Sequence, residues 1–112
     1  MKEDILKRYE KIEKDFFRNI KGGLDSIESA YLNSLPRELV ERIVADLAAN
    51  TRDLKVILQN MKNSGADRRK IGIKEKIVGE ISEMVGNPKF KRSFKNYLPK
   101  LKSLKTKLKP FC

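Results

Sequence analysis

The sequence has no histidine and no tryptophan, and its single cysteine, Cys112, is the last of 112 residues. Histidine is the commonest general base and the commonest neutral metal ligand in proteins, so the residue most often used for either purpose is missing. One thiol cannot form an internal disulfide or a cluster of thiolate ligands. Acidic residues mostly stand at helical spacing from basic ones, as Glu3 does from Lys7, which is typical of ion-paired helix surfaces. We therefore expect no enzyme activity, no cofactor and no metal site.

Long apolar runs are also missing, and no stretch approaches the roughly 20 residues needed to cross a bilayer. The first residues, MKEDILKRYEKIEK, are too charged for a secretory signal peptide. No segment alternates apolar and polar residues for long enough to predict a strand. We expect a cytoplasmic protein with a single all-α domain over residues 1–112, since this length matches the commonest size of one domain.

The apolar residues recur at spacings of three and four, which predicts a compact bundle of about five or six helices. The first helix is expected over residues 3–21 and is ended by Gly22 and Gly23, because glycine accepts the left-handed conformation found at many helix ends. A short helix over residues 26–33 follows, with Asp25 at the position of a cap.

Pro36 opens the next helix, because the first turn of a helix tolerates a residue without an N–H donor. The apolar spacing continues to residues 63–65, which predicts one long helix. Another helix is expected over residues 72–85. Asn87 and Pro88 then supply a cap and a first-turn proline for the last helical segment.

Acidic residues are absent from residues 89–112, which contain nine lysines and arginines. The formal net charge of the chain is +11, so this last fifth of the sequence carries most of the excess. A charge distribution this asymmetric attracts polyanions such as nucleic acid, anionic lipid or an acidic protein surface. Residues 89–112 are therefore the first candidate for a binding surface.

The same segment keeps an unbroken apolar register, with spacings of four, three, four, three, four and three. The members of this stripe are Phe90, Phe94, Tyr97, Leu101, Leu104, Leu108 and Phe111. A disordered tail would not keep such spacing, which is typical of a helix with one face against a core or a partner. Pro99 lies inside the pattern and clashes with the carbonyl of Lys95 in a regular helix. We expect a basic amphipathic segment packed on the domain, either as one helix kinked near Pro99 or as two helices meeting near Leu98.

Two groups of basic residues predict a nucleic-acid-binding surface. One group precedes and begins the helix over residues 72–85, and the other lies off the apolar stripe of residues 89–112. The candidate contacts are Arg68, Arg69, Lys70, Lys74, Lys91, Arg92, Lys95, Lys102, Lys105 and Lys109. Lysine outnumbers arginine eight to one in residues 89–112, which favours sequence-tolerant phosphate contact over the reading of base edges. The predicted partner is DNA or RNA, and binding should weaken strongly with salt.

The aromatic residues of this segment would stack on unpaired bases only if they were exposed, and their register with the leucines predicts burial. Two other functions are compatible with the sequence. The stripe would serve a protein-interaction module or a homodimer if it packed against a helical partner or a second copy. The basic and apolar faces also suit a helix lying on an anionic membrane, although Pro99 and the lack of tryptophan weaken that alternative. Nucleic-acid binding and assembly are not exclusive, because the lysines and the stripe occupy different faces.

Overall fold

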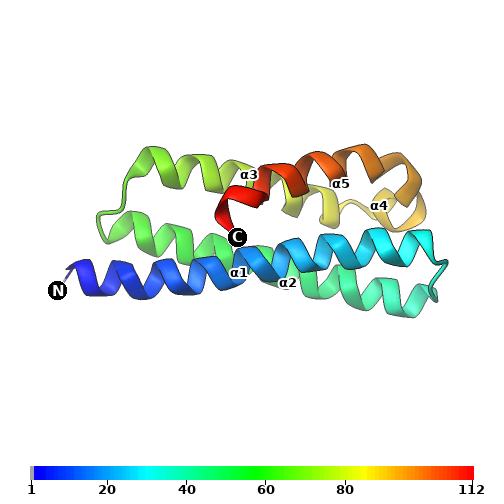
Figure 1. Cartoon of the computed structure of the whole chain (residues 1–112), viewed down its shortest axis with the longest axis horizontal. Coiled ribbons are helices and arrows are strands. Elements are labelled where there is room, and N and C mark those ends of the chain that lie inside the picture. The colour runs from blue at the N-terminus through cyan, green and yellow to red at the C-terminus, as the bar shows by residue number, and fades with distance from the viewer. Residues whose placement is uncertain (1) are drawn as a thin grey trace.

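A computed structural model describes residues 2–112 and contains helices but no strand in that range. The helices are α1 (Lys2–Leu32), α2 (Arg37–Asn63), α3 (Arg68–Gly86), α4 (Pro88–Arg92) and α5 (Phe94–Leu108), followed by the 3-10 helix η1 (Lys109–Phe111). The helices α1, α2 and α3 run back and forth side by side, and α4 and α5 return along α3 and α1 (Figure 1). The all-α bundle predicted from the apolar spacing is confirmed.

The bundle is 49 Å long and 21 Å across in both other directions. At 1.5 Å per residue, the 31 residues of α1 span about 46 Å, nearly the whole length. The 15 residues of α5 span only about 22 Å, so the C-terminus lies near the middle of the bundle (Figure 1). A cross-section of the bundle near the α1–α2 turn therefore contains four helices, and a cross-section near the start of α1 contains three.

The helix α1 continues through Gly22 and Gly23, so the predicted end at residue 21 and the separate helix over residues 26–33 are wrong. Neither glycine has a positive φ. Apolar residues on both sides of the pair lie on one face and are fully buried: Phe17, Ile20, Leu24 and Ile27. Their packing against the other helices favours a continuous helix more strongly than the two glycines disfavour it, since tertiary burial supplies most helix stability in proteins.

The turn from α2 to α3 follows its local sequence. The helix α2 ends at Asn63, within the range predicted for it. Gly65 has φ +94°, a left-handed conformation that side chains rarely adopt. The Asp67 carboxylate accepts a hydrogen bond of 2.9 Å from the backbone N–H of Arg69, and this cap starts α3 four residues earlier than the predicted residue 72.

The turn between α3 and α4 was predicted correctly. The Asn87 side chain accepts a hydrogen bond of 2.9 Å from the backbone N–H of Lys89, and Pro88 occupies the first turn of α4. The C-terminal segment is split, as one of the two predicted forms requires. The break lies at Ser93 rather than at Leu98, and Pro99 lies on the exposed side of α5.

The break at Ser93 lets two aromatic rings of α5 fold back on the last ring of α4. Phe94 and Tyr97 pack edge-on against the fully buried Phe90, with ring centroids 5.0 Å and 5.2 Å from it. Further along the stripe, Leu101, Leu104 and Leu108 are at most 1% exposed, and the Phe111 ring lies 5.2 Å from that of Phe17 in α1. The stripe is therefore packed inside the bundle as part of its core.

Replacing Gly22 with alanine should raise the free energy of unfolding by roughly 0.5–1 kcal/mol, because Gly22 is inside a helix and an added Cβ meets no atom within 4 Å. Replacing Gly23 with alanine should stabilise the protein less or destabilise it. Its added Cβ would lie 3.0 Å from Cδ1 of the buried Leu47 in α2. Urea denaturation of both variants measures the difference. Destabilisation by Gly22→Ala would contradict a continuous α1, and equal gains would contradict the close approach at Gly23.

Candidate nucleic-acid interface

The outward face of the C-terminal helix carries three lysines in line. Lys95, Lys102 and Lys109 are seven residues apart and exposed, on the side opposite the buried leucines of the stripe. Seven residues correspond to about two helical turns, so neighbouring members of this lysine row are displaced by about 10.5 Å along the helix. Lys109 has helical dihedral angles and therefore continues the row into η1. No acidic residue occurs in residues 89–112 to neutralise the row locally.

A second group of cations lies at the end of the bundle where α2 begins and α4 turns (Figure 1). Lys91 and Arg92 of α4 line a cleft of about 470 Å³ together with Arg37, the first residue of α2. We call these three residues the bundle-end cluster. The Arg37 side chain is 80% exposed and its Nε lies 3.3 Å from a carboxylate oxygen of Glu41.

Sequence reasoning missed Arg37. It is far from residues 89–112 in the chain, and acidic residues follow it closely. Only the antiparallel arrangement of the helices places it beside α4. No local signal would have identified it.

Two other lysines of α5 are held in ion pairs at the flanks of the helix. The Lys105 Nζ lies 2.5 Å from an oxygen of Asp25 and 3.1 Å from one of Glu28, both in α1. The hydrogen bond that the Lys105 ammonium donates to Asp25 is the largest of several effects that raise the pKa of Lys105 above its ordinary value, against a smaller opposing effect of burial. On the other flank, the Lys107 Nζ lies 3.3 Å from an oxygen of Glu80 in α3. The predicted contact Lys105 therefore joins α5 to α1.

The predicted basic group before and within α3 divides between two settings. Arg68, Arg69 and Lys70 are exposed in the first turn of α3, at the end of the bundle opposite α4 (Figure 1). The 19 residues of α3 correspond to a separation of about 28 Å along the axis. The two predicted basic groups consequently do not form one compact cluster.

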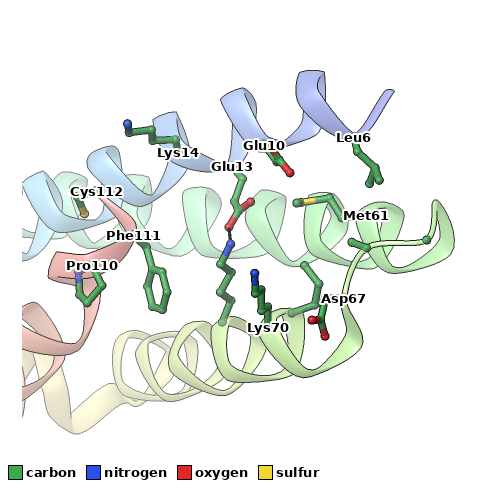
Figure 2. A pocket seen from close by; sticks show the side chains of 14 residues that line it. Leu6, Glu10, Glu13, Lys14, Met61, Asp67, Lys70, Pro110, Phe111 and Cys112 are labelled. Carbon is green, nitrogen blue, oxygen red and sulfur yellow. Dashed lines mark ion pairs between the residues drawn. The ribbon is translucent and has the colours of Figure 1, made fainter. Parts of the chain in front are cut away.

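The remaining candidate, Lys74, lies in a cleft of about 580 Å³. This cleft is found where the C-terminal segment ends and only α1, α2 and α3 continue. The Lys74 ammonium group forms an ion pair with the carboxylate of Glu13, which is only 3% exposed. Glu13 projects from α1 into this cleft (Figure 2). The same ammonium nitrogen lies 5.6 Å from the centroid of the Phe111 ring. Lys74 is therefore engaged within the protein, as Lys105 is.

Other kinds of site receive no support from residues 2–112. No group of three or more histidine, cysteine, aspartate or glutamate residues there is arranged to hold a metal ion. None of the described helices is long and apolar enough to span a membrane. Every fully buried side-chain nitrogen or oxygen in the described residues has a hydrogen-bond partner.

No protein-family model matches the chain, and no curated protein or solved structure is significantly similar to it. The distribution of charge over the surface is therefore the main guide to function.

The different settings of Lys102 and Lys105 predict different effects of removing their charges. Lys105→Gln should lower the free energy of unfolding by about 1 kcal/mol, because it breaks two partly exposed ion pairs. Lys102→Gln should change it by less than about 0.5 kcal/mol, since Lys102 is exposed. Chemical denaturation at neutral pH measures both.

The pH dependence of that difference has a definite sign. A cation whose pKa is higher in the folded state stabilises the protein below its unfolded-state pKa and loses this effect as the pH rises through the folded-state value. From neutral pH the stability gap between wild type and Lys105→Gln should therefore stay constant up to about pH 10.5, the ordinary lysine value, and shrink above it. A gap that widens with pH would contradict the assigned ion pairs.

Proposed function

We propose that the chain is a small helical nucleic-acid-binding protein that contacts phosphates without reading base sequence. The observation that carries this proposal is the lysine row, displayed on a helix whose opposite face is fixed in the core. The bundle-end cluster adds exposed cations at the end of the molecule, of which Arg37 is paired with Glu41. Such a ligand suits the cytoplasmic location expected from the sequence.

Lysine is well suited to this kind of contact. Its ammonium group is a compact charge on a flexible stem, and it meets a phosphate without the fixed geometry that arginine uses on guanine. Each lysine that neutralises a phosphate releases a condensed counterion, which drives binding at low salt. Five contacts, from Lys91, Arg92 and the lysine row, would give a slope of about −4.5 for log K against log salt on duplex DNA.

The two alternative functions, assembly with a helical partner or second copy and binding to an anionic membrane, both require the apolar stripe of residues 89–112. A stripe-mediated dimer or a membrane-lying helix would have to remove α5 from the bundle, where Leu101, Leu104 and Leu108 are buried. Removing α5 would uncover the core side chains of α1 and α3 that it packs against, and each large apolar side chain returned to water costs roughly 1.5–3 kcal/mol. Phosphate binding by the lysine row needs no such rearrangement, so it is the function that the geometry supports best.

The test compares two variants that lose the same charge from different faces. In Lys95→Gln/Lys102→Gln/Lys109→Gln the row is removed, and in Lys7→Gln/Lys11→Gln/Lys14→Gln three exposed lysines of α1 are removed. Binding to labelled DNA and RNA is followed by fluorescence anisotropy between about 50 and 200 mM salt. The row variant should make the salt slope shallower by about 2.7, while the α1 variant should keep the wild-type slope.

Equal losses in the two variants would mean that net charge alone, and no defined surface, causes binding. Failure of the wild type to bind any nucleic acid at low salt would refute the proposal. Binding of the wild type to vesicles with and without anionic lipid is measured in the same salt range. Tighter, salt-dependent binding to anionic vesicles than to nucleic acid would instead identify a lipid surface as the ligand.

A further inference from the structure

Single-stranded nucleic acids are commonly held by exposed aromatic side chains on which successive bases stack. The chain has three tyrosines and five phenylalanines and no tryptophan. All eight lie within the described residues, and each is buried or half-buried. The protein therefore presents no open aromatic platform next to its basic surface.

The aromatic residues nearest the lysine row already have partners for their rings. Phe94 and Tyr97 meet the Phe90 ring nearly at right angles, at 85° and 88°. Phe111 lies against Phe17 on one side, and the ammonium group of Lys74 lies over its ring. The side chains of Phe94, Tyr97 and Phe111 are half-buried, and presenting a whole ring face to a base would require breaking these contacts.

A surface that offers only charge favours the ligand with the higher charge density. Duplex DNA carries one charge per about 1.7 Å of its axis, which is twice the density that either of its strands contributes to the duplex. The lysine row also stands on a helix whose position is fixed by the core, with the Cα atoms of neighbouring members displaced by about 10.5 Å along that helix. A rigid duplex meets such a row without paying the ordering entropy of a flexible single strand.

We propose that the ligand of the lysine row is double-stranded nucleic acid, contacted through its phosphate backbone. This deepens the proposed function and rests on it. The row supplies the phosphate contacts, and the lack of a fully exposed aromatic side chain in the described residues removes the usual means of retaining an unpaired strand.

The first experiment compares a duplex with each of its separated strands by anisotropy at one low salt concentration. We expect the duplex to bind at least about tenfold more tightly, since the electrostatic contribution per contact is larger for duplexes than for single strands. Equal or tighter binding of the single strands would overturn the inference while leaving the proposed function intact. Absence of binding to either form would refute the proposed function itself.

A second experiment places an exposed aromatic side chain on the face that carries the lysine row. Thr106 is exposed on the same outward face, between Lys102 and Lys109 in the sequence. The variant Thr106→Tyr should increase single-strand affinity by about fivefold or more, the effect of one stacked base, and leave duplex affinity within about twofold. Gln59→Tyr, at an exposed position of α2, is the control and should change neither affinity. Unchanged single-strand binding in Thr106→Tyr would overturn the inference, because the missing aromatic would then not be what limits it.

Discussion

Burial of the apolar stripe between α1 and α3 is the interaction on which the rest of the structure depends. It fixes the rotation of α5 about its own axis, and that rotation places the lysine row outward. Ion pairs of Lys105 with α1 and of Lys107 with α3 secure the two flanks of the same helix. The function proposed for the row is therefore a consequence of core packing, since a basic segment without the stripe would present its charges in no fixed direction.

The ion pair of the buried Glu13 and the half-buried Lys74 lies where the C-terminal segment stops contributing to the core. Beyond Phe111 no further helix covers α1 and α3 in the described chain. Glu13 and Lys74 both line the resulting cleft, into which Glu13 projects (Figure 2). Buried pairs add little net stability, but removing one partner leaves an uncompensated charge and is costly. Glu13 and Lys74 thus hold α1 and α3 in register where the aromatic packing of η1 stops.

The sequence was most informative where local chemistry decides the structure. Asn87 and Pro88 identify their turn because a cap and a first-turn proline act within a few residues, and the stripe identified a buried face by its period. The helix end predicted at Gly22 and Gly23 was wrong because contacts to distant residues keep α1 helical. The ion pairs of Lys105 and Lys74, and the position of Arg37 beside α4, depend on how the helices pack, which spacing along one helix does not encode.

Hydrogen exchange of the α5 backbone amides tests most directly whether the lysines stand on a fixed helix of the core. If the stripe holds α5 as described, the amides of residues 101–108 should exchange as slowly as those in the centres of α1 and α2, through global unfolding. Their protection should persist when duplex nucleic acid is added. Exchange of α5 much faster than that of α1 and α2, or loss of its protection on binding, would show a detachable basic helix and contradict the account.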